Sequence, residues 1–212
     1  MKILNLIIAT WLLSASLASY AFAIEESPDA LIKRLSQEIV QTAKEDKEIQ
    51  SGDKKRIFEF AESKVVPVLD FKRMTSLAVG KNWRDATTDQ QAQLISEFRT
   101  LLIYTYSGAI SQIKDQRIEL KPFRADPVDT EVEVKSLVIR PRDEPLQLNY
   151  RLEKLPEGWK IYDINVMGVW LVETYKGNFA TEVGRSGIDG LIKTLTEKNR
   201  KLASVSSGKL IK

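Results

Sequence analysis

The sequence predicts one α+β domain in which a set of helices packs against a four-stranded antiparallel sheet. Apolar residues recur at helical spacing between positions 28 and 111, and again after Gly168. Between positions 117 and 166 they alternate with polar residues instead, which is the pattern of strands with one apolar face. Short links between the expected strands favour an antiparallel meander. Helices and strands segregated in this way are typical of the α+β class.

The N-terminal half of the domain is expected to be helical. Ser27-Pro28-Asp29 supplies a cap, a proline for the first turn and an acid at the positive end of a helix that runs to about Asp46. Further helices are expected from Asp53 to Pro67, from Asp70 to Gly80 and from Thr88 to Ile110. Thr88-Asp89-Gln90-Gln91 is interpreted as a capping box. Asp70 either caps its helix, which is the favoured interpretation, or contacts a partner.

The C-terminal half is expected to hold the sheet and a last helical segment. The four strands are centred on 117–121, 131–135, 146–152 and 159–166, with Pro156-Glu157-Gly158 as a turn. Helical spacing then starts at Leu171 and is interrupted at Gly187. Residues 203–212 are rich in serine and lysine and are expected to form a flexible tail.

The first 23 residues have the order of a secretory signal peptide. A basic start at Met1-Lys2 precedes a short apolar stretch, and Ala21-Phe22-Ala23 places small residues where a signal peptidase cleaves. Cleavage after Ala23 leaves residues 24–202 as a single exported domain. No later apolar run has membrane length.

Composition excludes several classes of function. The formal net charge is +3, too small to indicate a nucleic-acid partner. The chain has no cysteine and no histidine, which excludes Cys/His metal sites, disulfides, thiol catalysis and Ser-His-Asp triads. No acidic loop suited to a metal and no glycine-rich phosphate loop is found, so we expect no catalytic residue, no metal and no cofactor.

Three acidic residues leave alternatives open. Asp126 and Asp129 flank Pro127 and are either a carboxylate pair or, as we favour, solvated turn residues. Asp163 lies inside the fourth expected strand, as either a functional acid or a residue that faces solvent or pairs with a neighbouring strand. The second interpretation is favoured there as well.

Many aromatic residues fall on the apolar faces of the expected helices and strands. They either fill an ordinary core or line a cavity between the helices and a curved sheet. Periodicity does not distinguish these alternatives, because a cavity wall and a core have the same pattern.

The order of motifs along the chain resembles one family. The residues that carry the resemblance are Pro67, Asp70-Phe71, Met74, Gly80, Trp83, Ala86-Thr87, Gln90, Gln91, Phe98, Thr105-Tyr106, Pro122, Tyr150, Gly158-Trp159, Tyr162-Asp163, Gly168-Val169, Leu171-Val172, Tyr175, Phe179, Gly187 and Leu191. In this order they resemble the MlaC family, the periplasmic phospholipid-binding proteins of the pathway that maintains outer-membrane lipid asymmetry, also called toluene-tolerance proteins.

The resemblance implies a non-enzymatic periplasmic carrier whose cargo is phospholipid. The acyl chains would occupy a hydrophobic cavity between the helices and the sheet. The carrier would dock on an outer-membrane lipoprotein-porin complex and on an inner-membrane ABC transporter with an MCE-domain subunit. Trp170 stands where the family tends to have a small residue, and a large indole there would narrow the mouth of the cavity.

Apolar faces and the resemblance together give candidates for the lipid-binding pocket, with ordinary core packing as the alternative for each. They are Phe71, Met74, Leu77, Phe98, Leu102, Tyr106, Val134, Leu148, Tyr150, Ile164, Val169 and Val172. Candidates for the mouth are Lys81, Trp83, Arg84 and Trp170, although the basic residues are also typical of a solvated turn. Three other functions remain open: an exported chaperone or adaptor for an apolar protein segment, a carboxylate-dependent lipid hydrolase, and a structural domain with a filled core.

Overall fold

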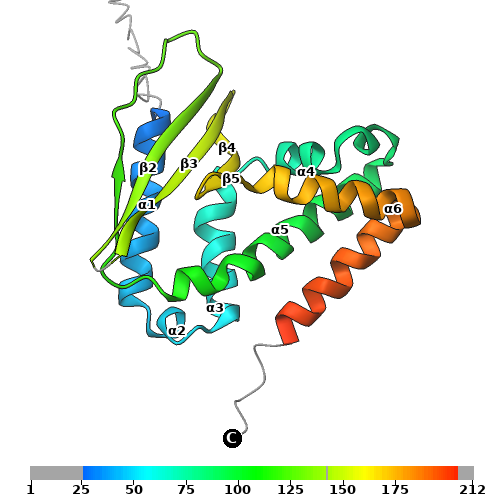
Figure 1. Cartoon of the computed structure of the whole chain (residues 1–212), viewed down its shortest axis with the longest axis horizontal. Helices are drawn as coiled ribbons and strands as arrows, with labels where there is room; N and C mark the ends of the chain where they lie inside the picture. Colours follow the sequence, from blue (N-terminus) through cyan, green and yellow to red (C-terminus); the bar gives the residue numbers. More distant parts are fainter. Residues whose placement is uncertain (1–25, 142, 205–212) are drawn as a thin grey trace, which may run out of the picture.

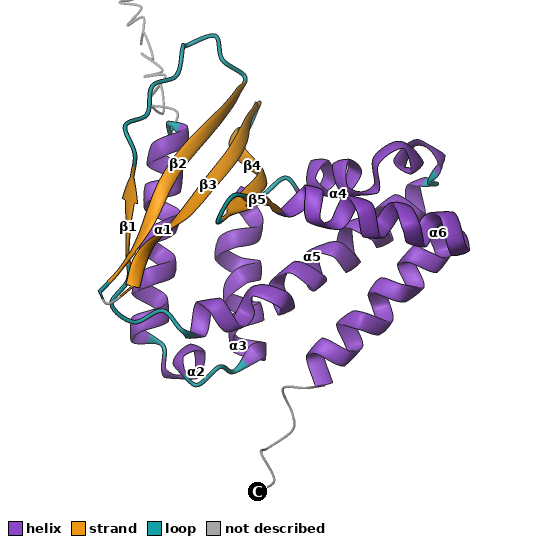
Figure 2. Ribbon diagram, viewed as in Figure 1, coloured by secondary structure: helices purple, strands orange, loops and turns teal. Residues whose placement is uncertain are grey.

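The computed structural model describes residues 26–141 and 143–204. The elements in chain order are α1 (Pro28–Glu45), α2 (Lys47–Gln50), α3 (Lys54–Phe60), η1 (Ala61–Val65), η2 (Val66–Val68), α4 (Phe71–Val79), η3 (Gly80–Asp85), α5 (Thr88–Ser111), β1 (Arg117–Leu120), β2 (Glu131–Arg140), β3 (Asp143–Leu155), β4 (Gly158–Val166), β5 (Val169–Trp170) and α6 (Leu171–Ser204). The sheet and α1 form one end of the molecule, α4 and α6 form the other, and α5 runs between them (Figures 1 and 2).

Helix α1 begins and ends where its sequence signals predict. The Ser27 hydroxyl accepts the N–H of Ala30 at 3.4 Å, and Pro28 occupies the first turn, where its missing N–H costs nothing. At the other end Asp46 caps two helices at once, because its backbone N–H closes α1 while its carboxylate accepts the N–H groups of Glu48 and Ile49 in α2.

The segment between α2 and α4 differs from the single helix expected from Asp53 to Pro67. Helix α3 ends at Phe60, the turn η1 is a π-helix, and η2 is a 3-10 turn that contains Pro67. Proline has no N–H and its ring clashes with the preceding turn, so the α-helical ladder cannot continue through this position. The expected helix is therefore broken into three short pieces.

Helices α4 and α5 start at side-chain caps. The Asp70 carboxylate accepts the N–H of Arg73 at 2.8 Å, which confirms its favoured role as the cap of α4. The capping box of α5 is formed by Thr87 and Gln90, each accepting the other's backbone N–H. The expectation placed this box one residue later, at Thr88, because both threonines precede a glutamine at the required spacing.

The sheet has five strands instead of the four expected, in the spatial order β1-β2-β3-β4-β5, and all pairs are antiparallel. The meander is confirmed. The additional strand, β5, has only two residues, which pair with Val166 and Asn165 after a turn at Met167-Gly168. Both turn residues have positive φ, 53° for Met167 and 88° for Gly168, so the chain reverses within two residues. Strand β5 therefore forms just before the start of the helical segment expected at Leu171.

Helix α6 contains the interruption expected at Gly187. The glycine adopts φ 73° and ψ −176°, a conformation that is open almost only to glycine, and the second half of the helix turns back toward α5 (Figure 1). Ala203 and Ser204, assigned to the tail from the sequence, continue α6, and the rest of that tail lies outside the described residues. The expected signal peptide, residues 1–23, also lies outside them.

Two apolar clusters fill the two ends of the molecule. The sheet cluster joins α1 to the inner face of the sheet through Leu31, Ile32, Leu35, Val134, Tyr150, Leu152 and Ile161. The helix cluster joins α4, α5 and α6 and includes Phe71, Met74, Leu94, Phe98, Leu101, Leu102, Tyr162, Val172, Tyr175, Phe179, Leu191 and Leu195. Alternation along β2 and β3 thus buries one face of the sheet under α1.

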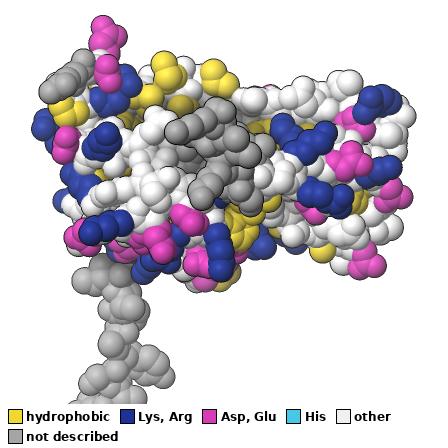
Figure 3. Space-filling model, turned by 90° about the horizontal axis from the view of Figure 1, so that it is seen from below, with side chains coloured by type: hydrophobic (Ala, Val, Ile, Leu, Met, Phe, Trp, Pro, Cys, Tyr) yellow, Lys and Arg dark blue, Asp and Glu magenta, His cyan; other side chains and the backbone are white. Residues whose placement is uncertain are grey.

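The face of the molecule seen in Figure 3 is charged but mixed. Figure 3, which views the molecule from below, shows basic side chains interleaved with acidic ones, as expected from the small net charge. Across residues 26–141 and 143–204, no helix combines the length and apolar character needed to cross a membrane.

Candidate functional site

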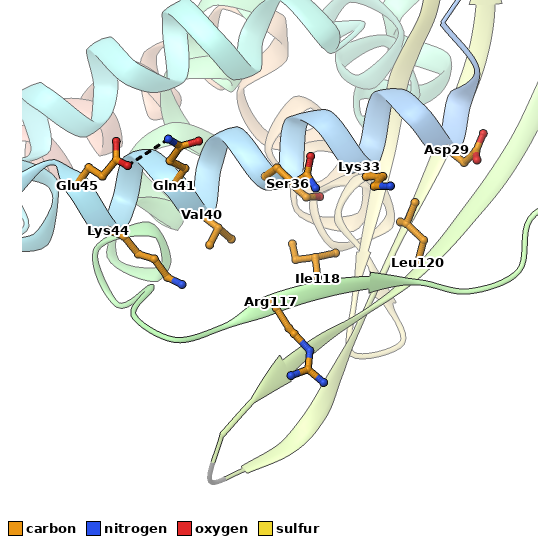
Figure 4. A pocket seen from close by; sticks show the side chains of 11 residues that line it. Asp29, Lys33, Ser36, Val40, Gln41, Lys44, Glu45, Arg117, Ile118 and Leu120 are labelled. Carbon is orange, nitrogen blue, oxygen red and sulfur yellow. Dashed lines mark hydrogen bonds between the residues drawn. The ribbon is translucent and has the colours of Figure 1, made fainter.

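A groove of about 800 Å³ lies between helix α1 and the edge strand β1 (Figure 4). This volume falls in the range of small-molecule binding sites. The lining residues are Asp29, Lys33, Ser36, Gln37, Val40, Gln41, Lys44, Glu45, Arg117, Ile118 and Leu120. Eight of these come from α1 and three from β1, so the groove is the space that remains where the helix and the sheet edge separate.

The floor of the groove is apolar and its rim is polar. Val40 from the helix and Ile118 from the strand extend into the space between the two elements, and Leu120 lies further along the strand (Figure 4). Because side chains alternate along β1, Ile118 and Leu120 face α1 while Arg117 turns away and pairs with Glu119 at 2.8 Å. An apolar floor with charged edges suits a ligand that is itself amphiphilic.

Behind this floor lies the sheet cluster. Leu120 lines the groove and also packs against the sheet cluster. Ser36, a buried residue of α1, lines the groove and hydrogen-bonds the hydroxyl of Tyr150, which also contacts Ser136. Burial raises the pKa of Tyr150 to about 12, so the phenol is neutral at physiological pH. The groove is therefore separated from the apolar interior of this end by a single layer of side chains.

The structure divides the sequence-predicted pocket residues between the two clusters. Val134 and Tyr150 belong to the sheet cluster, and Leu148 and Ile164 pack against it. Phe71, Met74, Phe98, Leu102 and Val172 belong to the helix cluster, with Tyr106 packed against it. None of these residues lines the groove itself, and only the first four lie at its end of the molecule.

Two of the predicted pocket residues are not on inward-facing surfaces. Leu77 is 40% exposed, because α4 turns Phe71, Met74 and Ala78 inward and leaves Leu77 at the edge of that stripe. Val169 is 57% exposed, because it follows the tight turn at Gly168 and points away from the sheet edge. The expectation that both lie on inward apolar faces was wrong.

The predicted mouth residues do not come together. Lys81, Trp83 and Arg84 lie on η3, a 3-10 turn that packs beside α4 and α6, and Trp83 covers the helix cluster. Trp170 lies on β5 at the edge of the sheet, where the Arg151 guanidinium stacks on its ring at 3.8 Å from the centroid. The mouth expected from these four residues is therefore not formed by them as one opening.

Asp163 connects the sheet to the helical end. It is 2% exposed, its carboxylate accepts the N–H groups of Ile164 at 2.9 Å and Val172 at 3.1 Å, and Arg151 lies 3.8 Å away on the neighbouring strand. Burial raises the pKa of Asp163, while the two N–H groups and Arg151 oppose that effect. The carboxylate thus caps the start of α6 and pairs with Arg151 of the neighbouring strand β3. The pairing with a neighbouring strand is part of the favoured interpretation, whereas the cap on α6 was not expected.

A second ionic cluster lies on the sheet face opposite α1. Arg73 from α4 pairs with Glu131 and Glu153, both at 2.7 Å, and stacks on Tyr162 at 3.6 Å from the ring centroid. The hydrogen bond from Arg73 lowers the pKa of Glu131, whereas burial raises the pKa of Glu153. These contacts fasten α4 to the sheet, while the Oε1 atom of Glu153 is buried without a hydrogen-bond partner among the described residues.

The remaining acidic candidates are turn residues. The Asp129 carboxylate accepts the N–H of Asp126 at 2.8 Å, and the Asp126 carboxylate accepts the N–H of Val128 at 3.1 Å. Side chains that close their own turn in this way fit the favoured interpretation. In the part of the chain that the structure describes, no cluster of acidic residues is arranged to hold a metal ion.

Sequence reasoning missed the groove residues on α1. Lys33, Gln37, Val40 and Lys44 recur on one side of the helix next to its apolar stripe, and this spacing is the signal that the sequence offered. A polar stripe beside an apolar one is also typical of any solvated helix. Only the position of β1 beside α1 shows that these residues line a groove instead of facing open solvent.

Comparison with known proteins gives the family of this chain and two of its relatives. The family described as "MlaC protein" matches residues 33–197. The intermembrane phospholipid transport system binding protein MlaC of Haemophilus influenzae is 20% identical over 188 residues, which cover 87% of this chain and 88% of that protein. The toluene tolerance protein ttg2D of Pseudomonas putida is 23% identical over 165 residues, covering 77% of this chain and 76% of that protein.

A solved structure has the same fold as this chain. The phospholipid-binding protein from Ralstonia solanacearum, determined in complex with a phospholipid, superposes with a TM-score of 0.79 at 43% sequence identity, covering 82% of this chain and 98% of that chain. The fold and these relatives define the class as that of phospholipid-binding transport proteins. The family match over most of its length shows that it belongs to the MlaC family, which confirms the resemblance drawn from the sequence.

Proposed function

We propose that this protein is a periplasmic carrier that binds phospholipid as its cargo and moves it between the two membranes. The observation that supports this most strongly is the 43% identical Ralstonia solanacearum protein with a phospholipid bound, since the match covers 98% of that chain. The Haemophilus influenzae relative is named as the binding protein of an intermembrane phospholipid transport system, which fits a carrier and not an enzyme, a chaperone or a purely structural domain.

The physical need for such a carrier is the cost of exposing acyl chains to water. Each methylene contributes about 0.8 kcal/mol, so two chains of ~16 carbons would cost roughly 25 kcal/mol in an aqueous gap. An apolar cavity replaces one hydrocarbon environment with another and removes most of that barrier without a chemical step. Direction would then have to come from the complexes on which the carrier docks.

The acyl chains are proposed to enter between α1 and β1. The floor of the groove is apolar at Val40, Ile118 and Leu120, and the sheet cluster lies directly behind it. Of the sequence-predicted pocket residues, Val134, Leu148, Tyr150 and Ile164 are at this end and are the ones proposed to contact cargo. Strand β1 is the edge strand of the described sheet, so no further strand pairs with it on the side of the groove.

The partners proposed for the carrier are an outer-membrane lipoprotein-porin complex and an inner-membrane ABC transporter with an MCE-domain subunit. Both follow from the family, and export to the periplasm follows from the signal peptide expected at residues 1–23. The formal net charge of +3 and the mixed charge of the face seen in Figure 3 give little attraction to an anionic bilayer, which favours docking on protein partners.

Native mass spectrometry and solvent extraction of the purified mature protein test the function. We expect a mass increment that corresponds to diacyl phospholipid, and a matching lipid in the extract. Wild-type protein that is folded but has the mass of the bare polypeptide under gentle conditions would contradict the proposal.

A pair of variants tests the entry route. Ile118→Glu places a charge on the floor of the groove, and we expect it to lower bound lipid severalfold because burying an unpaired carboxylate beside acyl chains is costly. Val128→Glu makes the same chemical change at a residue that is 81% exposed and remote from the floor, and it should retain wild-type lipid content. Equal lipid content in the two variants, both folded by circular dichroism, would rule out this route.

A further inference from the structure

Two lysines stand at opposite ends of the α1–β1 groove. Lys33 and Lys44 are both exposed, both line the groove and lie three helical turns apart, about 16 Å along α1. Among the residues that the structure describes, neither has an ion-pair partner, although most arginines of the molecule do. An unpaired ammonium beside an apolar floor is suited to the anionic group of an amphiphile.

The surroundings of the two lysines differ. Lys33 follows Asp29 by four residues on the same helix, and Asp29, whose carboxylate accepts the Ser27 hydroxyl at 2.6 Å, lines the same end of the groove. At the other end the acid next to Lys44 is Glu45, whose carboxylate accepts a hydrogen bond from Gln41 at 3.1 Å and points away from β1 (Figure 4). Lys44 extends from α1 toward β1 (Figure 4), so its ammonium is directed across the groove.

The charges on the facing strand largely cancel. Arg117 lies on β1 near Lys44 and its guanidinium is paired with Glu119, so these two residues together add little net charge. Lys44 is also one helical turn from Val40 on the apolar floor, close enough for one lipid to contact both.

We propose that Lys44 binds the phosphate of the lipid headgroup and gives the carrier a preference for lipids of net negative charge, because a zwitterionic headgroup brings a cation of its own beside the ammonium. This inference rests on the proposed function and assigns a role within the same site. The phosphate belongs to a lipid and not to a free ion, because the neighbouring floor is apolar and would gain nothing from a free ion. Lys33 lies in the same groove but runs along α1 instead of extending toward β1 (Figure 4), so it is not part of the headgroup site.

Loading from mixed vesicles tests this assignment. Lipid-free protein is incubated with vesicles of equimolar phosphatidylglycerol and phosphatidylcholine that have identical acyl chains, and the lipids carried by the recovered protein are quantified. We expect wild-type protein to enrich phosphatidylglycerol about two- to fivefold, the size of an exposed ion pair. Lys44→Gln should load in the donor ratio with total lipid unchanged, whereas Lys33→Gln, the matched loss of one charge, should keep the wild-type ratio.

The other outcomes separate the two proposals. Wild-type protein that carries no lipid would overturn the proposed function, whereas protein that carries both lipids in the donor ratio would overturn only the role of Lys44. Equal loss of preference in the two variants would show diffuse attraction to the vesicle and overturn the assignment. The assignment would also be overturned if millimolar inorganic phosphate abolished the preference for phosphatidylglycerol without lowering total bound lipid, since Lys44 would then bind free phosphate.

Discussion

The two ends of the molecule bury similar side chains but close to different degrees. In the helix cluster, Phe98 packs edge-on against Tyr175 and Phe179, with ring centroids 5.0 and 5.2 Å apart, and three helices enclose the group. In the sheet cluster, α1 covers a twisted sheet together with Val65, Val68 and Leu69 from the segment between α3 and α4, and along β1 the helix leaves a groove of about 800 Å³. A straight helix loses contact with a twisted sheet toward the edge of that sheet, which leaves space there. Helices can instead pack on all sides of one another and enclose their shared apolar residues.

This difference assigns different roles to the two ends. The side chains of the helix cluster pack against one another, and we expect this end to contribute mainly to stability. The sheet cluster stays accessible at one edge, and the proposed cargo would complete it. Substitutions in the helix cluster should therefore change the free energy of unfolding, and substitutions along α1 and β1 should change bound lipid.

The largest effect is expected for Phe98→Ala. Phe98 is fully buried, and its removal leaves a cavity between two aromatic rings, which should lower the free energy of unfolding by about 3–5 kcal/mol. Chemical denaturation measures the change, and Phe98→Leu, which conserves more volume, should cost less than half as much. If the Phe98→Leu variant remained folded but no longer bound lipid, the assignment of lipid binding to the sheet end of the molecule alone would be contradicted.

A smaller effect is expected where α6 turns back. Gly187→Ala forces a side chain into φ 73°, ψ −176°, and should cost about 1–3 kcal/mol in unfolding free energy. The control is Gly184→Ala on the same helix, where φ is helical and the added methyl meets no atom, so that change should stabilise by about 0.4–1 kcal/mol. Similar stabilisation by both substitutions would mean that the turn in α6 is not fixed by glycine.

The smallest effect concerns Asp163 at the junction of the two ends. Burial raises its pKa above the unfolded value, so the folded protein holds this proton more tightly than the unfolded chain does. The stability of wild type relative to Asp163→Asn should therefore rise as the pH falls from 7 toward 4, by less than about 1 kcal/mol because two N–H groups and Arg151 oppose the effect of burial. Urea denaturation at several pH values measures it, and a difference that grows in the other direction would contradict the assigned cause.

Local signals predicted most of the fold. Caps at Ser27 and Asp70, the breaker at Gly187 and the alternation in 117–166 depend on residues close in sequence, and the structure places helices and strands there. The capping box was shifted by one residue because Thr87 and Thr88 offer equivalent patterns. Strand β5 was missed because two residues are too few for an alternation to be recognised.

The candidate site was less predictable, for a physical reason. Apolar spacing shows that Phe98 and Tyr150 face inward, but it does not show which interior each one enters, and they enter different clusters. The groove depends on the separation of α1 from β1, which is set by sheet twist and helix packing rather than by either segment alone. Asp163 illustrates the same point, since its bond to the start of α6 links residues that only the tertiary fold brings together.

The two strands at the edges of the sheet are also its shortest. Strand β1 has four residues and β5 has two, while the three inner strands have between nine and thirteen. Long exposed edges template the addition of strands from other molecules and so promote aggregation. Because β1 pairs only with residues 136–139 of β2 and β5 only with residues 165–166 of β4, parts of both inner strands also lie at the edge of the described sheet, and the bridge between Leu69 and Ile161 covers one of them in the middle of β4.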